Sequence, residues 1–356
     1  MKKLTKGLMV LSLGALFVGC SCNNDNGDNE PRIEYNYDSN YVYDDVSSNL
    51  TALYNEAVKS TVVVRSSNGV STQVGSGVVY KEEGNVAYIL TNAHVLTDKA
   101  GTDYYSNIEI IFSNYVKVKG TFIYLDKNED VGVISVAKSD NYTVAKIVSS
   151  DTDTKVGDQV FSIGNPHGNY FSVTTGVISK NKLETTTDYI SGSSATKTYV
   201  FNSTATINPG NSGGAMFNSK GEVIAINSMQ PNSEDIRNFN YSIPINYFVK
   251  VANYIVTNRS LYVKTNLNLT GKSICDYSVD QISTLGIVVK KGVHVTESQE
   301  TEVSKGRIIT HVNGVEVATL DDYKYELLKY SKNETVTLTT VDITGTNVRN
   351  VNLTMK

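Results

Sequence analysis

The sequence contains no tryptophan, only five prolines and only three cysteines in 356 residues. Five prolines and 26 glycines exclude proline-rich and collagen-like chains. Cys20 and Cys22 lie close to the N-terminus, so Cys275 is alone in the rest of the chain and no disulfide framework can form there. The 32 basic residues do not outnumber the 36 acidic ones, and a formal net charge of −4 provides no basic footprint for nucleic acid. We therefore expect a globular protein that does not bind nucleic acid.

Histidine is also scarce, with four residues in the chain: His94, His167, His294 and His311. No two of them stand at the spacing of a metal-binding pair, and no cysteine pair lies beyond the N-terminal segment. We therefore expect neither a metal site nor a cofactor. We expect His167 to be a loop residue and assign no catalytic role to it, to His294 or to His311, so His94 is the candidate base.

Residues 1–22 have the pattern of an export signal. Three lysines precede an apolar run from Leu8 to Val18, which is too short to span a membrane and fits the hydrophobic region of a secretory signal. The stretch FVGC resembles a bacterial lipobox, which implies a signal peptide over residues 1–19 and a lipid-modified Cys20. The alternatives are an ordinary cleaved signal peptide and a short anchor helix. All three place the body outside the cytoplasm, and we expect a membrane-anchored lipoprotein at the bacterial cell surface or envelope.

Residues 20–45 are rich in Asn, Asp and Tyr and show no sustained helical or strand period. Such a segment cannot bury enough apolar surface to offset the entropy that it would lose on ordering. We interpret it as a disordered tether between the lipid anchor and a folded body.

The body has mainly the pattern of short strands. One helical period runs from Val46 to Val58, and a second covers residues 245–258. Between them, β-branched runs alternate with Gly, Asn, Asp and Ser turns, which is typical of a β-sandwich or β-barrel. These runs cover residues 61–64, 77–80, 86–90, 108–112, 131–136, 159–163, 173–179, 198–201 and 222–226. The remainder, from about residue 260, is long enough for a small second domain.

Three residues of the body have the chemistry of nucleophilic acyl transfer. His94 follows an apolar strand, Asp130 opens another, and Ser212 stands in the glycine-rich stretch NPGNSGGAMF. A serine hydroxyl needs an adjacent base, a neutral imidazole can accept its proton, and a buried carboxylate orients that imidazole. Asp126 is close enough in sequence to compete for the carboxylate role, which we assign to Asp130. We expect the N–H groups of Gly210 and Ser212 to form the oxyanion hole.

In this order, the motifs resemble the HtrA/DegP family of trypsin-like serine proteases. The resemblance implies a mainly β protein whose trypsin-like protease domain, over residues 46–258, has two six-stranded β-barrels with the triad in the cleft between them. It also implies a homotrimer or a higher oligomer. The matching segments, within residues 48–257, are GSGVVY (75–80), TNAHV (91–95), DVGVISV (130–136), SDTDTKVGDQVFSIGNPHG (150–168), VTTGVIS (173–179), TINPGNSGGAMFNSKGEVIAIN (206–227) and NYSIP (240–244).

The resemblance further implies a pocket for the substrate residue that precedes the cut. Thr206 supplies part of its floor and carries no charge, so a basic substrate side chain would be buried there without a counter-ion. Asn240 and Ser242 stand where the family usually has glycine and alanine, which makes the pocket shallower. We expect a preference for small or medium aliphatic residues. The expected pocket residues are Thr206, Ile207, Asn227, Ser228, Met229, Asn240 and Ser242.

Residues 262–356 resemble a PDZ domain, on the strength of GRIITHVNGVEV (306–317) and a helix that begins near Asp321. A PDZ domain binds an extended peptide as an added strand and holds its C-terminal carboxylate on backbone N–H groups. The spacing places that carboxylate loop at Gly271, Lys272, Ser273 and Ile274. The alternative is a docking or regulatory spacer. No motif that carries chemistry lies in this segment, so we expect the triad to assemble without it.

These resemblances imply an ATP-independent serine endopeptidase of the cell envelope that cleaves misfolded or exposed polypeptides in protein quality control and the stress response. Its partners would be unfolded polypeptides, a membrane through the lipid anchor and a C-terminal peptide at the PDZ domain. Two alternatives remain at this point. One is a non-hydrolytic chaperone or scaffold on the same fold, and the other is a signalling protease regulated through the PDZ domain.

Overall fold

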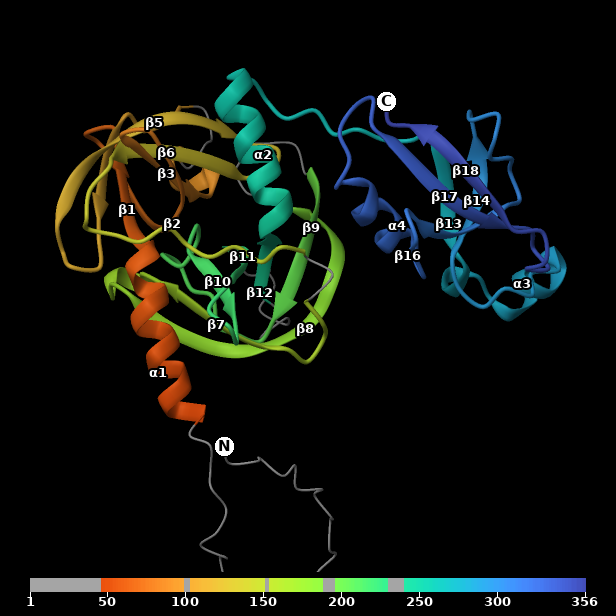
Figure 1. The fold of residues 1–356 in the computed structure, drawn as a ribbon, viewed down its shortest axis with the longest axis horizontal. Coiled ribbons are helices and arrows are strands. Elements are labelled where there is room, and N and C mark those ends of the chain that lie inside the picture. Colours follow the sequence, from red (N-terminus) through yellow and green to blue (C-terminus); the bar gives the residue numbers. More distant parts are fainter. Residues whose placement is uncertain (1–45, 99–102, 151–153, 188–195, 230–239) are drawn as a thin grey trace, which may run out of the picture. The chain divides into compact units, whose positions relative to one another are not determined.

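The structure is a computed structural model that describes residues 46–98, 103–150, 154–187, 196–229 and 240–356 (Figure 1). The expectations for the signal peptide, the lipid attachment at Cys20 and the tether fall on residues 1–45 and lie outside the described residues. Within the described ranges, no helix has both the length and the apolar character needed to cross a membrane.

The first half of the body forms a closed antiparallel barrel in the strand order β1-β2-β3-β6-β5-β4. In β1, Val62 and Val64 point into this barrel, whereas Val63 packs against the core that the two barrels share. Burial of both faces explains why β1 reads as a continuous apolar run. The strands are β1 (Thr61–Ser67), β2 (Thr72–Glu83), β3 (Val86–Thr91), β4 (Asn107–Ile111), β5 (Lys117–Asp126) and β6 (Val131–Ala137).

The second half forms another closed barrel, in the order β10-β11-β12-β9-β8-β7. Phe161 and Phe217 stack in its core with ring centroids 5.1 Å apart. The expected fold of two six-stranded barrels is therefore confirmed (Figure 1). The strands are β7 (Gln159–Gly164), β8 (Ser172–Thr187), β9 (Thr196–Ser203), β10 (Ala215–Asn218), β11 (Val223–Met229) and β12 (Asn240–Pro244).

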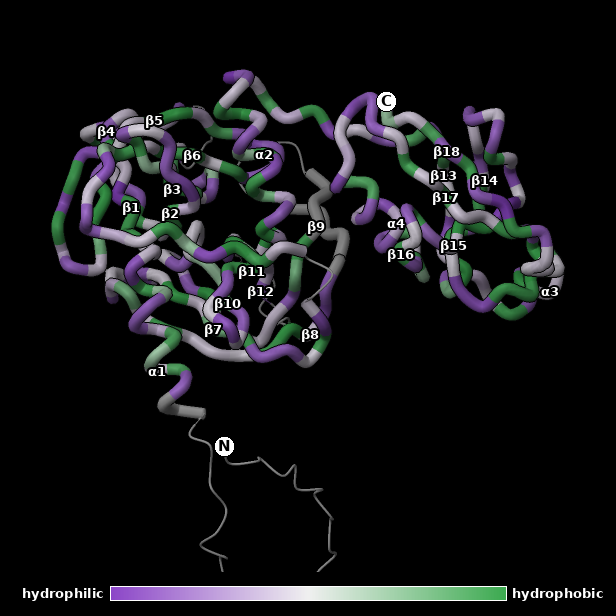
Figure 2. The backbone as a smooth tube through the Cα atoms, in the orientation of Figure 1, coloured by the Kyte–Doolittle hydropathy of each residue, from purple (hydrophilic) through white to green (hydrophobic). Residues whose placement is uncertain are grey.

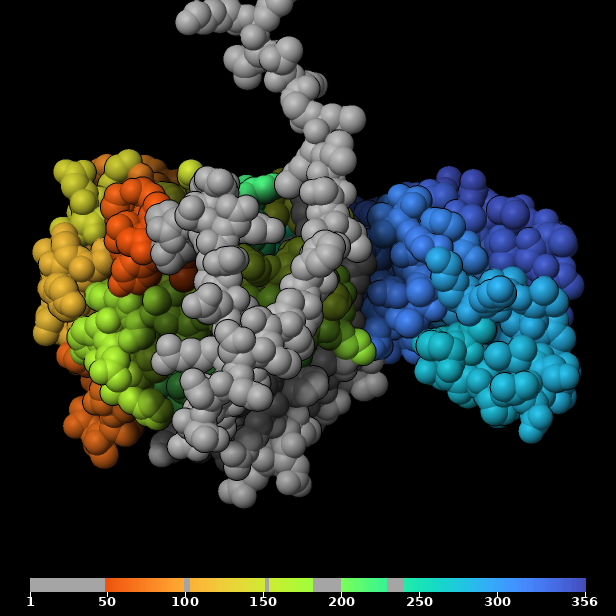
Figure 3. Space-filling model, turned by 90° about the horizontal axis from the view of Figure 1, so that it is seen from below, coloured from red at the N-terminus to blue at the C-terminus, as the bar shows by residue number. Residues whose placement is uncertain are grey.

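Two helices flank the barrels. Helix α1 (Val46–Ala57) continues into a 3-10 turn, η1 (Val58–Ser60), and its Leu50 and Tyr54 pack on the shared core. Figure 3 shows α1, in red-orange, on the molecular surface beside green residues of the second barrel, where Tyr54 Oη donates a hydrogen bond of 2.9 Å to Phe171 O. Helix α2 (Ile245–Asn258) buries one face, and Figure 2 shows hydrophobic and hydrophilic stretches alternating along it. Both helices agree with the sequence periods.

The C-terminal part has its own sheet, in the order β13-β14-β15-β17-β18 with β16 paired to β15. A hydrophobic cluster that includes Val295, Ile309 and Leu338 forms its core. The elements are β13 (Leu269–Ser273), η5 (Ile274–Asp276), α3 (Val279–Leu285), β14 (Val293–Ser298), β15 (Ile308–Val312), β16 (Val315–Glu316), α4 (Leu320–Leu327), β17 (Thr335–Val341) and β18 (Arg349–Thr354).

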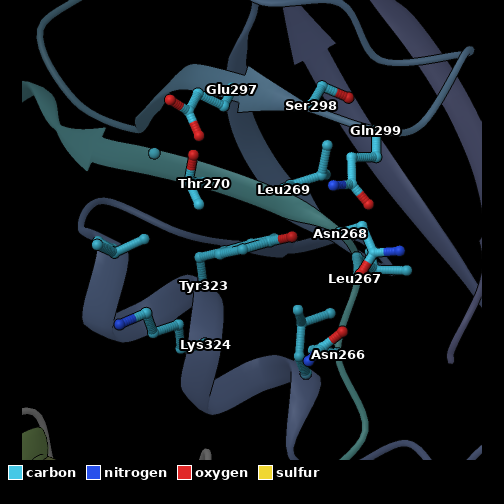
Figure 4. Close-up of a pocket in the computed structure, with 13 residues that line it drawn as sticks. Asn266, Leu267, Asn268, Leu269, Thr270, Glu297, Ser298, Gln299, Tyr323 and Lys324 are labelled. Atoms are coloured by element: carbon cyan, nitrogen blue, oxygen red, sulfur yellow. The ribbon is translucent and has the colours of Figure 1, made fainter.

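One expectation for this part is wrong: residues 271–274 do not form a loop. Gly271, Lys272 and Ser273 belong to β13 and pair with β14, and Ile274 is buried in η5. Gly271 is a packing requirement of the sheet, because a Cβ there would lie 2.5 Å from Val293 Cγ1. A groove of about 780 Å³ lies instead between residues 266–271 and helix α4, and Figure 4 shows Tyr323 reaching from α4 beneath β13.

Candidate active site

The pairing of β3 with β6 brings His94 and Asp130 together. Thr91, the last residue of β3, lies opposite Gly132 at the start of β6, so the end of one strand adjoins the beginning of the other. His94 follows β3 in the 3-10 turn η2 (Ala93–Val95). Asp130 immediately precedes β6 and has a φ of 53°, a left-handed conformation that aspartate tolerates better than most residues.

Asp130 is fully buried, and hydrogen bonds join it to His94, Asn92 and Ser228. The Nδ1 atom of His94 lies 2.9 Å from Oδ1 and 3.0 Å from Oδ2 of Asp130, and the His94 backbone N–H donates to Oδ1 at 3.1 Å. The hydroxyl of Ser228 donates to Oδ2 at 2.9 Å, and the Asn92 amide donates to the Asp130 carbonyl at 3.1 Å. This arrangement fixes the tautomer that leaves Nε2 of His94 free to accept a proton.

Burial lowers the pKa of His94, but the charge and the hydrogen bond of Asp130 outweigh that effect, so this pKa lies above its usual value. Only the neutral imidazole can act as a base, so kcat/KM for a peptide substrate should rise as pH increases through this pKa, with its midpoint above about pH 6.5. The measurement is a pH–rate profile across the neutral range. In the residual activity of Asp130→Asn, this limb should move to lower pH, and an unmoved limb would contradict the assignment.

Ser212 lies in the turn before β10 and is held from the first barrel. The Ser76 N–H donates to the Ser212 carbonyl at 2.8 Å, and the Ser76 hydroxyl donates to the Gly210 carbonyl at 2.7 Å. The Ser212 hydroxyl donates to the Ser228 carbonyl at 2.9 Å. Among the contacts of the described residues, none joins this hydroxyl to His94.

The backbone around Gly210 is arranged for an oxyanion hole. The carbonyl of Pro209 accepts the His167 N–H at 3.0 Å, and because N–H and C=O of a trans peptide point in opposite directions, the Gly210 N–H faces away from His167. In the described part of the chain, no acceptor takes the N–H of Gly210 or of Ser212. Gly210 has a φ of +104°, and a Cβ there would lie 2.2 Å from Asn165 O. Only glycine fits this position.

Four of the seven expected pocket residues form two hydrogen-bonded groups. Asn240 accepts the N–H of buried Ile207 at 3.3 Å and donates to Ser203 O at 3.4 Å, so its side chain ties two backbone segments together. Asn227 Oδ1 accepts the hydroxyls of Ser242 at 3.1 Å and of Ser162 at 3.2 Å.

The other three expected pocket residues differ in position. Thr206 is exposed, and its carbonyl accepts the Thr174 hydroxyl at 3.0 Å. Met229 ends β11, and its side chain lies outside the described set. Ser228 contacts Asp130 through its hydroxyl and Ser212 through its carbonyl.

Sequence reasoning also missed the part played by Asn165. This buried side chain donates to Gly75 O at 3.2 Å and to Ser76 Oγ at 2.9 Å, and it accepts the Phe171 N–H at 3.1 Å. It therefore connects the 165–171 segment, which orients the Pro209 carbonyl, to β2. The stretch GNPHG (164–168) was the signal that the sequence offered for Asn165. Its contacts with the backbone of Gly75 and Phe171 could not be read from the sequence, because backbone groups are the same in every residue type. No group of three or more His, Cys, Asp or Glu residues that could hold a metal occurs in the described ranges.

Two closed six-stranded barrels, with a histidine and an aspartate on the first and a serine turn on the second, form a trypsin-like protease fold. Residues 75–226 match a family model described as a trypsin-like peptidase domain. This part of the chain is therefore similar to that class of peptidase.

Two curated relatives are described as "Serine protease HtrA-like". The protein from Staphylococcus aureus strain MRSA252 is 30% identical over 299 residues, and the one from strain USA300 is 30% identical over 298 residues. Each match covers 78% of this chain, and the chain spans 38% of the length of each relative.

Two solved structures share the fold. One is of the HtrA-type protease AlgW with a tripeptide, with a TM-score of 0.60 at 19% identity and coverage of 86% of this chain and 97% of that one. The other is of an AlgW variant with a decapeptide, with a TM-score of 0.53 at 18% identity and coverage of 86% and 96%.

Proposed function

We propose that this protein is a serine endopeptidase that cleaves polypeptides through an acyl-enzyme. The observation that carries the proposal is the buried Asp130 carboxylate, which holds His94 through Nδ1 next to the Ser212 turn. In this mechanism Ser212 Oγ attacks the scissile carbonyl while His94 Nε2 takes its proton and then gives it to the leaving amine. The N–H groups of Gly210 and Ser212 stabilise the oxyanion, and loss of one such donor typically costs roughly 3 kcal/mol of barrier.

A fluorophosphonate probe tests this proposal directly. The probe should label the purified wild-type protein covalently at Ser212, and it should not label Ser212→Ala. Ser228→Ala is an informative second variant, because it removes the hydroxyl that supports Asp130 and keeps the nucleophile. Peptide mapping that finds the label elsewhere, or finds none on folded wild-type protein, would contradict the proposal.

We propose a role in protein quality control at the cell envelope, where the protein cleaves misfolded or exposed polypeptides without ATP. The support is the similarity to proteins described as HtrA-like serine proteases. A homotrimer or higher oligomer is part of this proposal and rests on the family resemblance alone. Mass measurement of the purified protein in solution tests it, and a stable monomer at all concentrations would refute it.

The location is proposed from the N-terminal sequence. Cleavage before Cys20 would leave a diacylglyceryl cysteine, and the two chains of that group suffice for stable anchoring where one chain would not. Cys20→Ala should move the protein from the detergent-extracted membrane fraction to the aqueous one. Intact-mass spectrometry that finds an unmodified N-terminus, or a cut elsewhere, would rule out the lipoprotein.

We propose that the C-terminal part is a PDZ-like domain whose ligand is an extended peptide. Strand β13 is the first strand of its sheet and pairs with β14, so its outer edge can accept an added strand beside helix α4. The groove of about 780 Å³ between them is the place for that peptide. A peptide with a free, apolar C-terminus should bind more tightly than its amidated form, and equal affinities would refute recognition of the carboxylate.

We expect cleavage after small or medium aliphatic residues such as Val, Ala and Ile. Thr206 offers no counter-charge to Lys or Arg, and the Asn240 side chain bridges Ile207 and Ser203 where a glycine would leave space. Each methylene is worth only about 1–3 kcal/mol, so the preference should be graded. The measurement is a mass-spectrometric catalogue of cuts in casein, in which Asn240→Gly should shift the preference towards Phe and Tyr. A catalogue dominated by cuts after Lys or Arg would refute the proposed pocket preference.

A further inference from the structure

The turn that presents Asp130 contains two further buried carboxylates, Asp126 and Glu129. Asp126 Oδ1 accepts the N–H groups of Asn128 at 2.9 Å and Glu129 at 3.2 Å, which shapes the turn between β5 and β6. Asp130 follows directly with its left-handed φ of 53°. The conformation of the residue that orients His94 is therefore set by its immediate neighbours in this turn.

The second oxygen of each of these two carboxylates contacts the same distant segment. Asp126 Oδ2 accepts the Tyr262 N–H at 2.6 Å, and Glu129 Oε1 lies 2.9 Å from Lys264 Nζ. Tyr262 and Lys264 belong to the stretch that joins α2 to β13. The sequence pattern places Tyr262 and Lys264 in the C-terminal domain, and these contacts join both residues to the turn that carries Asp130.

The joining stretch is also held at other points. Arg259 donates to Ile123 O of β5 at 2.6 Å. The ring of Tyr262 makes edge contacts with Tyr247, at 6.1 Å between centroids, and with Tyr254, at 5.3 Å. The hydroxyl of Tyr247 donates to Glu129 Oε2 at 2.8 Å. A helix, a joining segment and the Asp130 turn thus meet at one buried carboxylate.

The ion pair of Glu129 with Lys264 differs from an ordinary surface pair, because Glu129 keeps only 3% of its exposure. Burial raises the pKa of Glu129, and the charge of Lys264 opposes that rise. Without Lys264, a buried carboxylate next to Asp130 would have to take up a proton or move towards water. Either change alters the turn that carries Asp130.

We propose that Lys264, through Glu129, is a positioning residue for the catalytic aspartate, and that residues 259–264 clamp the Asp130 turn in its working conformation. The proposal rests on the proposed peptidase function for its kinetic consequence. Its physical content is that the joining segment restrains Asp130 relative to His94. A displacement of this segment by the C-terminal part would then change the position of Asp130 relative to His94.

The test compares full-length Lys264→Met with Lys138→Met and Lys264→Arg. Lys138 pairs with Glu82 at 2.5 Å just beyond the opposite end of β6, so its substitution removes an ion pair of the same barrel away from Asp130. Lys264→Met should lower kcat, expressed per fluorophosphonate-titrated site, by about 10- to 100-fold with little change in KM. Lys138→Met should match the wild type, and Lys264→Arg should recover most of the loss.

A second measurement does not require turnover. The His94 pKa, followed by proton NMR and assigned with His94→Ala, should fall in Lys264→Met because the contact with Asp130 is loosened. A loss of thermal stability with kcat per titrated site and the His94 pKa both unchanged would overturn the proposal. If the wild-type protein failed to react with the fluorophosphonate probe, the peptidase function would be refuted instead. The His94 titration would then test by itself whether residues 259–264 restrain Asp130.

Discussion

Ser212→Ala and His94→Ala should each abolish peptide hydrolysis while leaving the fold intact. In serine peptidases the loss of either group lowers kcat by about 10⁶-fold, because the two act as one unit. Among the described residues the Ser212 hydroxyl donates only to the Ser228 carbonyl, and His94 keeps a quarter of its side chain exposed, so neither substitution opens a large cavity. The measurement is kcat for a peptide substrate together with the thermal unfolding midpoint of each variant. Variants that unfold at the wild-type temperature but still turn over substrate would contradict the assignment.

The carboxylate assignment has its own matched pair of variants. Asp130→Asn should lower kcat by about 10⁴-fold, because the amide favours the wrong tautomer of His94. Asp126→Asn is the control, since Asp126 is equally buried and its carboxylate accepts backbone N–H groups of Asn128, Glu129 and Tyr262. Its effect should stay within about 100-fold, through the turn and the Tyr262 contact. If Asp126→Asn abolished turnover and Asp130→Asn did not, the two roles would have to be exchanged.

Much of the fold could be predicted from the spacing of apolar residues in the sequence. The run at residues 61–64 is apolar throughout because Val62 and Val64 face the barrel and Val63 faces the shared core. The helical period at 245–258 matches α2 residue for residue. The chemistry of acyl transfer and the family resemblance predict that His94 and Asp130 are partners, and the contact between them follows from the register of β3 with β6.

What escaped prediction depends on backbone geometry or on contacts between distant residues. The His167 N–H fixes the Pro209 carbonyl, and any residue other than proline could supply that group. The family resemblance places Ser228 in the pocket, whereas its contact with Asp130 is seen only in the structure. The spacing predicts a loop at Gly271, but this glycine lies in β13 and packs against Val293. Lys264 belongs to a segment that the sequence pattern assigned to another domain.

Gly210→Ala should lower kcat by about 10²- to 10³-fold, with little change in KM. Alanine does not readily adopt a φ of +104°, and its Cβ would lie 2.2 Å from Asn165 O, so the peptide before residue 210 has to rotate or shift. The N–H that should stabilise the oxyanion would then point elsewhere. Because this donor acts on the transition state, the affinity for a peptide aldehyde or boronate should fall in parallel with kcat.

Gly157→Ala is the control that separates catalysis from backbone strain. Gly157 has a similar φ of +94°, but a Cβ there meets nothing within 4 Å. Both variants should therefore lose stability through the unfavourable φ, while only Gly210→Ala should lose kcat per folded molecule. Equal losses of kcat in the two variants would trace the effect to general strain, and a Gly210→Ala enzyme within about threefold of the wild type would remove this N–H from the oxyanion hole.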